Sequence, residues 1–226
     1  MKVLLFGATG MVGAGVLLEC LDDHRVESVL SIGRSPTGLV HPKLREVLRS
    51  DFFRFDDLRV QFAECDACFF CLGVTSVGLD EAVYTRLTYD LTLAAAQVLV
   101  AANRNATFCY VSGLGTDSTE RGRRMWARIK GRTENALLAL GFKAAYMFRP
   151  GYIQPMRGVR SKTGWYQALY SVMAPAYPLL HGLFPSQTTT TVNLGRAMLR
   201  VVIGESPQRI LHSREINALA ESLASR

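Results

Sequence analysis

The sequence lacks any hydrophobic run long enough to span a membrane: no segment offers about 20 uninterrupted apolar residues. The start, Met1–Phe6, places one cation before an apolar run as a signal peptide does, but three glycines within Gly7–Gly13 and the acidic Glu19 break that pattern. Charged residues make up 20% and hydrophobic residues 49% of the chain, which excludes a disordered protein. We therefore expect a folded chain that is neither secreted nor membrane-spanning.

Cysteine is scarce and odd in number, which argues against a disulfide framework. The five cysteines are Cys20, Cys65, Cys68, Cys71 and Cys109, and four of them fall in apolar segments. This pattern indicates reduced thiols in a cytoplasmic protein. The Cys65-x-x-Cys68-x-x-Cys71 spacing is metal-like, but Cys68 and Cys71 fall on a predicted strand, where residues three apart face opposite sides. We expect no metal site.

Acidic residues are fewer than basic ones, and the formal net charge is +7. Such an excess favours anionic ligands or surfaces without choosing among them. Six cations lie between Arg121 and Arg132, on a predicted helix, with no aromatic interleaving or nucleic-acid motif beside them. We interpret them as a solvated helix face and expect a small-molecule substrate rather than nucleic acid as the partner.

Short aliphatic runs alternate with longer helical patterns, which predicts an α/β protein with a doubly wound parallel sheet and a ligand crevice at the carboxyl ends of its strands. The predicted strands are Lys2–Phe6, Ser28–Ile32, Glu46–Arg49, Ala67–Leu72, Thr107–Val111 and Ala144–Phe148. The predicted helices are Met11–Leu21, Asp56–Ala63, Glu81–Asn103 and Thr119–Leu140, where apolar residues recur at three- and four-residue spacing.

The sequence pattern changes after Pro150: the segment Thr163–Gly195 contains no Asp, Glu, Lys or Arg. We expect a single domain over residues 1–226, in which residues 151–226 contribute a small substrate lobe. Its aromatic and aliphatic side chains suit an apolar substrate wall, or else peripheral contact with a membrane surface. A helix near residues 192–202, a strand near 209–211 and a final helix starting at Ser213 complete the prediction. The sequence leaves oligomerisation open.

The first predicted strand is followed by the turn Gly7-Ala8-Thr9-Gly10-Met11-Val12-Gly13, which opens a helix. In that setting Gly7 permits the sharp turn, Gly10 lets backbone N–H groups approach a pyrophosphate, and Gly13 lets helix and strand pack closely. A lone glycine motif also fits an ordinary tight turn, but its place in a βαβ unit of about 30 residues favours dinucleotide binding.

The second predicted strand ends at Ile32-Gly33-Arg34, where an NAD-specific site usually carries an acidic residue. A guanidinium at Arg34 can clamp a 2′-phosphate, so the sequence favours NADP(H) over NAD(H). Arg34 pointing into solvent is the alternative. Asp51 and Phe52, after the third strand, are expected to contact the adenine by carboxylate and backbone.

At these positions the sequence resembles the atypical short-chain dehydrogenase/reductases, which are epimerase-like, and most closely the branch of the Tat-interacting-protein oxidoreductases and their bacterial relatives. The matching residues are Gly7–Gly13, Ile32–Arg34, Asp51–Phe52, Cys71–Thr75, Ser112–Gly113, Lys130–Gly131 with Glu134, and Phe148–Gly151. The resemblance implies a Rossmann fold that binds NADP(H). It also implies that Leu72, Gly73 and Val74 line the adenosine path and that Pro150 belongs to the cofactor site.

The family resemblance implies a Tyr-x-x-x-Lys pair on a helix and a serine after the fifth strand. Lys130 and Ser112 are present, but Trp126 stands four residues before the lysine. Tyrosine can donate and recover a proton, whereas an indole N–H does not ionise usefully. Three explanations stay open: Ser112, Tyr110 or Tyr152 supplies the proton, the reaction needs none there, or the protein binds NADP(H) without turnover. The expectation is thus an NADP(H)-dependent oxidoreductase for an unknown carbonyl or related small substrate, or a non-catalytic NADP(H)-sensing module.

Overall fold

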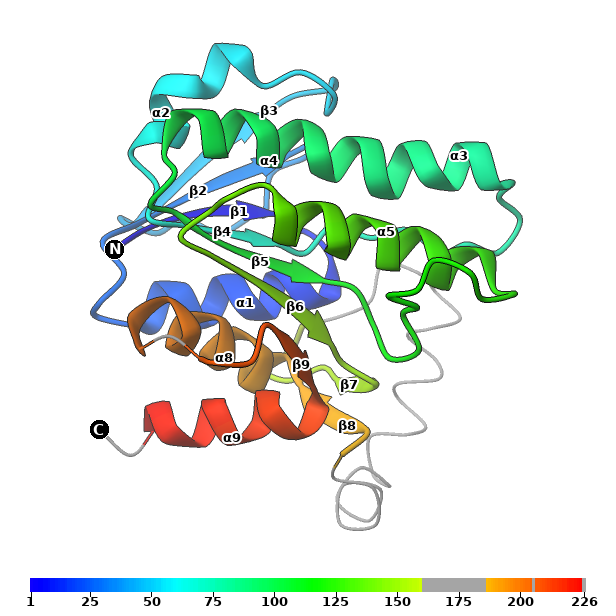
Figure 1. Cartoon of the computed structure of the whole chain (residues 1–226). Helices are drawn as coiled ribbons and strands as arrows, with labels where there is room; N and C mark the ends of the chain where they lie inside the picture. Colours follow the sequence, from blue (N-terminus) through cyan, green and yellow to red (C-terminus); the bar gives the residue numbers. More distant parts are fainter. Residues whose placement is uncertain (160–185, 205, 225–226) are drawn as a thin grey trace.

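A computed structural model describes residues 1–159, 186–204 and 206–224 of the chain, and its centre is a seven-stranded parallel sheet (Figure 1). The strand order is β3-β2-β1-β4-β5-β6-β9. The bounds are β1 Lys2–Phe6, β2 Ser28–Gly33, β3 Leu44–Leu48, β4 Ala67–Phe70, β5 Thr107–Val111, β6 Ala144–Arg149 and β9 Ile210–His212. Successive strands are added outward from β1 on one side and from β4 on the other, so the winding reverses between β1 and β4.

The strands are apolar on both faces because helices cover both sides of the sheet. In β1, Val3 and Leu5 belong to one buried hydrophobic cluster, whereas Leu4 and Phe6 belong to a second cluster on the opposite face. This alternation follows from the two-residue period of a strand. The two clusters form the cores of the two helix–sheet interfaces.

Two helical layers enclose the sheet (Figure 1). One consists of α1 (Met11–Asp22), α8 (Thr191–Gly204) and α9 (Ser213–Ala224), and the other of α2 (Arg59–Ala63), α4 (Leu91–Ala102) and α5 (Met125–Ala139). The short elements η1 (Asp56–Leu58), α3 (Glu81–Thr85) and η2 (Arg86–Asp90), a turn of π-helix, precede helices of the second layer. A Cβ at Gly15 would lie 2.4 Å from Cβ of Thr191, so this glycine lets α1 and α8 pack closely.

The structure confirms the predicted doubly wound parallel sheet, with local differences. The third strand is Leu44–Leu48 rather than Glu46–Arg49, and β4 ends before Cys71. Helix α5 begins at Met125, not Thr119. The carboxylate of Asp117 accepts hydrogen bonds from the backbone N–H groups of residues 119, 121 and 122, which holds this stretch as a loop.

The carboxyl-terminal region divides between two sheets. Strand β9 pairs with β6, and α8 packs on α1, so these elements belong to the main layers. Strands β7 (Tyr152–Gln154) and β8 (Thr188–Thr190) form a separate parallel pair. The rest of the expected lobe, residues 160–185, lies outside the described residues, as does most of the segment considered for membrane contact. In the described ranges, the helices are too short or too polar to cross a membrane.

Candidate dinucleotide and substrate site

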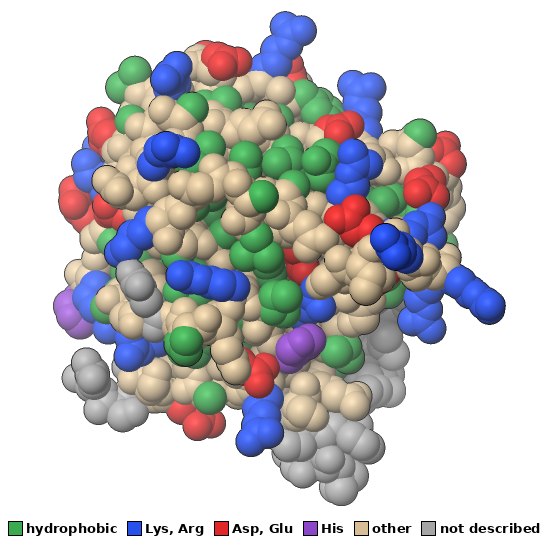
Figure 2. Space-filling view, viewed as in Figure 1, with side chains coloured by type: hydrophobic (Ala, Val, Ile, Leu, Met, Phe, Trp, Pro, Cys, Tyr) green, Lys and Arg blue, Asp and Glu red, His purple; other side chains and the backbone are tan. Residues whose placement is uncertain are grey.

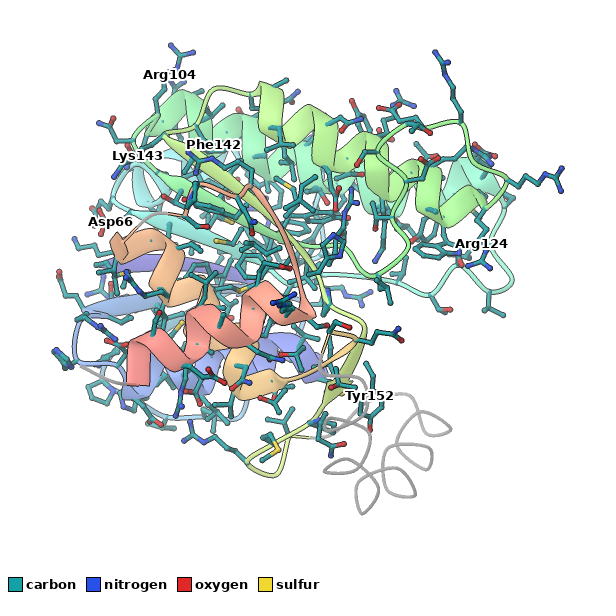
Figure 3. All side chains as sticks on the ribbon, turned by 60° about the horizontal axis from the view of Figure 1, so that its bottom comes forward. Asp66, Arg104, Arg124, Phe142, Lys143 and Tyr152 are labelled. Atoms are coloured by element: carbon teal, nitrogen blue, oxygen red, sulfur yellow. The ribbon has the colours of Figure 1, made fainter. Side chains whose placement is uncertain are left out.

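A cavity of about 830 Å³ lies at the carboxyl ends of the central strands, next to the point where the winding reverses. In Figure 3, Asp66, Arg104 and Lys143, which precede β4, β5 and β6, lie at one end of the sheet, and Tyr152 lies at the opposite end. The lining comes from six segments of the chain: Gly10–Val12, Cys71–Gly73, Val111–Leu114, Trp126 with Lys130, Pro150–Ile153, and Gln187–Thr188. The cavity therefore occupies the place where doubly wound folds bind ligands.

The glycine turn shapes one wall of this cavity. Gly7 has a φ of +85°, and a Cβ at Gly13 would lie 2.1 Å from the carbonyl oxygen of Gly7. The Gly10 N–H donates to the Gly7 oxygen over 2.9 Å, and α1 begins at Met11. The first N–H groups of a helix have no partner within it, so those of α1 suit an anion at the cavity wall, where the first turn carries no acidic residue.

The end of β4 gives the next part of the wall. Cys71, Leu72 and Gly73 line the cavity, whereas Val74 lies beyond it and is exposed. A Cβ at Gly73 would meet no atom within 4 Å. Thr9 is partly buried in the glycine turn but does not line the cavity. The glycine turn and the segment after β4 thus lie on either side of the point where the winding reverses. Only Gly10–Val12 of the first and Cys71–Gly73 of the second line the cavity.

Three other residues predicted at the adenosine end, Arg34, Asp51 and Phe52, lie outside the cavity lining. Arg34 is exposed after β2, and Asp51 is exposed with its carboxylate accepting the N–H of Phe53 over 2.7 Å. The side chain of Phe52 is buried and packs edge-to-face on Phe55, with ring centroids 6.2 Å apart. Phe52 therefore offers its backbone, and its ring belongs to the core.

Helix α5 places Trp126, Lys130 and Glu134, which the sequence resemblance singled out, at four-residue spacing. The Lys130 ammonium donates to the backbone oxygen of Ser112. Burial lowers the pKa of Lys130 to about 8, against an opposing effect of the Glu134 charge. The Trp126 ring lies beside the backbone of Gly115, whose φ of +85° brings the loop close to it.

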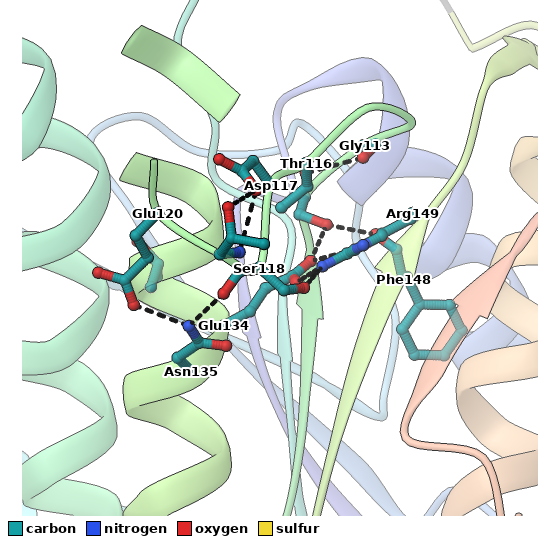
Figure 4. A network of polar contacts seen from close by, with 12 residues as sticks. Gly113, Thr116, Asp117, Ser118, Glu120, Glu134, Asn135, Phe148 and Arg149 are labelled. Carbon is teal, nitrogen blue, oxygen red and sulfur yellow. Dashed lines mark hydrogen bonds and ion pairs between the residues drawn. The ribbon is translucent and has the colours of Figure 1, made fainter. Parts of the chain in front are cut away.

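A buried polar network, drawn in Figure 4, surrounds Glu134. The Ser112 hydroxyl is 2.5 Å from Oε1 of Glu134 and 3.1 Å from the oxygen of Phe148, both of them acceptors. Glu134, fully buried, forms an ion pair with Arg149, which also donates to the hydroxyl of Ser118. A charge pair of this kind must be fully hydrogen-bonded to be tolerated in a core. Ser112 is therefore part of the structural support of the pair.

The two tyrosines named above as possible proton donors, Tyr110 and Tyr152, do not present a free hydroxyl hydrogen to the cavity. Tyr110 is buried, does not line the cavity, and has its pKa raised strongly by burial. Tyr152 lines the cavity, but its hydroxyl donates to Oε1 of Gln154 over 2.8 Å. Neither hydroxyl directs its hydrogen into the cavity.

The sequence predicted a substrate lobe after Pro150 but not the second sheet, nor the cavity-lining residues Ile153, Gln187 and Thr188. Tyr152 and Ile153 on β7, with Gln187 and Thr188 beside them, line the cavity. Gly151 allows this pairing, since a Cβ there would lie 2.2 Å from the oxygen of Gln187. The one available signal was Gly151 next to Pro150, because the pairing joins segments about 35 residues apart. Leu114 was missed too; its N–H donates to the oxygen of Pro150.

The cations of residues 121–132 do not form a single basic patch, because two of them have separate partners. Arg128 forms an ion pair with Glu81, and Arg132 stacks over the ring of Tyr89 at 4.3 Å. On the face shown in Figure 2, Lys and Arg side chains are scattered among acidic and apolar ones. Among the residues that the structure describes, no three His, Cys, Asp or Glu side chains are grouped so as to hold a metal ion.

No protein-family model matches the sequence. Among curated proteins, the chain is similar to the mitochondrial protein FMP52 of Debaryomyces hansenii, with 26% identity over 67% of this chain and 66% of that protein. It is also similar to HTATIP2 of Rattus norvegicus, with 28% identity over 67% of this chain and 62% of that protein. The matches thus span about two thirds of the length of these relatives.

Solved structures share the fold at low identity. A short-chain dehydrogenase of Burkholderia cenocepacia in complex with NADP superposes with a TM-score of 0.63 at 14% identity, covering 99% of this chain and 92% of that one. The enzyme WbmF of Bordetella bronchiseptica in complex with NAD⁺ gives 0.66 at 13%, covering 99% and 77%. The chain is thus similar in sequence to HTATIP2 and FMP52, in agreement with the sequence resemblance, and it shares the Rossmann fold of these two solved structures.

Proposed function

We propose that this protein is an NADP(H)-dependent oxidoreductase that acts on a small carbonyl compound or a related acceptor. One observation carries the proposal: the amino-terminal N–H groups of α1 and the Lys130 ammonium border the same cavity. This arrangement suits a dinucleotide laid across the strand ends, with its pyrophosphate at α1 and its nicotinamide ribose at Lys130. Structural neighbours in complex with NAD or NADP support a nicotinamide dinucleotide as the cofactor.

The close approach around the glycine turn fits such a cofactor. Side chains are missing where a pyrophosphate would meet the backbone, and Gly13 keeps α1 against the turn. Arg34, exposed at the end of β2, is the residue that we assign to a 2′-phosphate, which makes NADP(H) the preferred form. When bound, the reduced nicotinamide supplies a hydride; the chain supplies position and charge.

A second candidate function is a non-catalytic module that binds NADP(H) and presents its surface to a partner. Trp126 favours it, because the indole stands in the cavity at the position where the resemblance implies a tyrosine. An indole N–H donates a hydrogen bond but does not deliver a proton at ordinary pH. Binding and turnover are therefore separate questions for this chain.

Turnover separates the two candidates. NADPH consumption is followed by absorbance with a panel of acceptors, for the unaltered chain, Lys130→Ala and Arg104→Ala. Arg104 is the matched control, because it is exposed at the opposite end of the sheet (Figure 3). Steady consumption that Lys130→Ala abolishes and Arg104→Ala leaves intact is the expected result. NADPH binding without consumption for any acceptor would assign the chain to the second function.

We further propose that the protein works in the cytoplasm on a small molecule, since its five cysteines suit a reducing compartment. The printed names of the FMP52 relatives specify mitochondria for those proteins. Fractionation of cells that express the chain from its own gene tests the location. Recovery in an organelle or membrane fraction would contradict this part of the proposal.

A further inference from the structure

The Lys130 ammonium carries hydrogens that the fold does not use. Lys130 lines the cavity, and its Nζ lies 3.9 Å from the position of a Cβ on Gly113. An ammonium has three N–H donors. Within the described part of the chain, the ammonium makes one hydrogen bond, which it donates to the backbone oxygen of Ser112. Two N–H groups are therefore left for ligands in the cavity.

The buried network leaves the ammonium outside any ion pair. Oε1 of Glu134 accepts from the Ser112 hydroxyl over 2.5 Å and from Nε of Arg149 over 3.0 Å, and Oε2 accepts from Arg149 as well. Among the residues that the structure describes, Lys130 forms no ion pair, because the carboxylate one turn along α5 is engaged by Arg149. A neutral carbonyl oxygen thus positions Nζ without a bound counter-charge that would hold its proton.

The surroundings of Lys130 make its proton transferable near neutral pH. Burial lowers the pKa of Lys130 to about 8, against the opposing charge of Glu134 on the same helix. From β6, the charge that faces this region is Arg149, which is paired with Glu134. Cys71 and Tyr152 are the other titratable side chains of the described cavity lining. A group with a pKa near the working pH is the most effective general acid or base.

The side chain at position 126 contributes to this environment. Trp126 stands one turn before Lys130 on α5 and lines the same cavity. Its ring atoms lie 3.4 and 3.9 Å from the position of a Cβ on Gly115, so the loop backbone holds the indole in place. Leu114 and Ile153 add aliphatic surface to the cavity. Apolar surface beside an ammonium removes water from it and thereby favours the neutral amine.

Resting on the proposed function, we propose that Lys130 is the general acid of the reaction and delivers a proton to the oxygen of a carbonyl acceptor. The acceptor carbon gains a hydride from C4 of the reduced nicotinamide, and the π electrons of the C=O bond move to the oxygen. One N–H bond of Lys130 breaks, its electron pair stays on Nζ, and an O–H bond forms. The amine regains a proton from water, so that one NADPH, one carbonyl compound and one proton give NADP⁺ and an alcohol.

The first test needs no cofactor. The full chain is exposed to short pulses of acetic anhydride at pH 6 to 11, and acetylation of each lysine is measured by peptide mass spectrometry. Only the neutral amine reacts, so we expect half-maximal labelling of Lys130 near pH 8. Lys2 is the internal control, because its hydrogen bond to Glu64 raises its pKa above 10.5. A midpoint for Lys130 equal to or above that of Lys2 would overturn the assignment.

A variant of the indole extends the labelling test. Trp126→Ala lets water reach the ammonium and is expected to raise the labelling midpoint of Lys130 by about one pH unit. Leu138→Ala is the matched control: Leu138 lies on the same helix, is 39% exposed and does not line the cavity, so the midpoint should not move. Equal midpoints in the two variants would contradict the part assigned to the indole.

The second test separates an acid from a fixed charge. NADPH oxidation is measured with benzaldehyde and cyclohexanone, and NADP⁺ reduction with benzyl alcohol and cyclohexanol, at pH 6 to 10. Reduction should slow and alcohol oxidation should speed up as the pH rises through the pKa of Lys130, since the ammonium is the acid and the amine is the base.

Lys130→Arg keeps the positive charge, but a guanidinium does not give up its proton. We expect this variant to lose about 100- to 10,000-fold in both directions, the usual contribution of a general acid or base, while it still binds NADPH. Arg132→Lys is the matched control, an exchange of cations at an exposed position of α5 that does not line the cavity. Its rates should equal those of the unaltered chain.

The outcomes distinguish this assignment from the proposed function. A loss of less than about tenfold in Lys130→Arg would mean that Lys130 acts through its charge alone. That result would overturn the acid assignment and leave the oxidoreductase function standing. NADPH binding by the unaltered chain with no oxidation by any acceptor would overturn both proposals.

Discussion

The two sides of the cavity are built in different ways. The side at β1, α1 and β4 is made of backbone, with glycines at positions 7, 10 and 13 that bring N–H groups to the surface. The side at α5 is made of long side chains, and most of their polar atoms are used on one another: Ser112 on Glu134, Glu134 on Arg149, and Lys130 on Ser112.

This difference means that anion binding and proton transfer depend on different sides of the cavity. A backbone site for an anion needs only geometry, and the glycine turn fixes that geometry. Proton transfer needs a group that can give up its hydrogen, and on the α5 side Ser112 and Glu134 are held in a buried network. A substitution on one side of the cavity should therefore change stability or cofactor affinity through that side alone and leave the opposite side intact.

The largest effect is expected at the buried ion pair. Glu134→Ala leaves the Arg149 guanidinium charged and almost unpaired in the core, which should lower the free energy of unfolding by about 3–5 kcal/mol. Glu81→Ala is the control, because Glu81 pairs with Arg128 at the surface, where such pairs contribute about 1 kcal/mol or less. Urea unfolding measures both variants; equal losses would mean that the network does not support the α5 side.

On the side of the cavity formed by the glycine turn, the expected effect comes from steric crowding. Gly13→Ala places a Cβ 2.1 Å from the oxygen of Gly7, so α1 must move, at a cost of about 3 kcal/mol and with loss of NADPH binding. Gly73→Ala, where no atom lies within 4 Å, is the control for stability. Thermal unfolding and cofactor titration check the pair. A stable Gly13→Ala that binds NADPH normally would contradict the role of the turn.

The charge at Lys130 gives a pH-dependent effect. Burial lowers its pKa from 10.5 to about 8, so between these pH values the folded chain releases a proton that the unfolded chain retains. Stability from this group is therefore lowest below pH 8 and rises as the pH increases toward 10.5, by up to about 3 kcal/mol. Lys130→Met should remove that rise. Unfolding curves of the two proteins at pH 7, 8, 9 and 10 test the difference; parallel curves would contradict it.

The smallest effect sharpens the cofactor assignment. Arg34→Ala should weaken NADPH binding about 10-fold, or about 1.4 kcal/mol, and leave NADH binding unchanged, because only NADPH carries the 2′-phosphate. Arg54, another exposed cation, provides a control variant, Arg54→Ala. An equal loss for both dinucleotides would show that Arg34 does not contact the 2′-phosphate.

Much of the fold was predictable because the strands are apolar runs bounded by polar turns, as in Lys2–Phe6 and Thr107–Val111, which the structure reproduces residue for residue. The start of α5 was not predictable in the same way. Helical spacing extends back to Thr119, but the Asp117 carboxylate competes for the backbone N–H groups there. Glu120, with a φ of +61°, also departs from helical geometry.

The cavity lining was predictable where it depends on local sequence, as at Gly10–Val12 and Lys130. It was not predictable where distant segments meet. Nothing in the sequence shows that the Ser112 hydroxyl donates toward Glu134 or that β7 pairs with β8, because both depend on tertiary placement. The four-residue spacing of Trp126, Lys130 and Glu134 was the sequence signal that these side chains lie along one face of α5.

The most direct test of the account is a calorimetric titration of the pure chain with NADPH and NADH side by side. The account predicts one dinucleotide per chain, with NADPH bound more tightly. Tighter binding of NADH, or no binding of either dinucleotide, would contradict it.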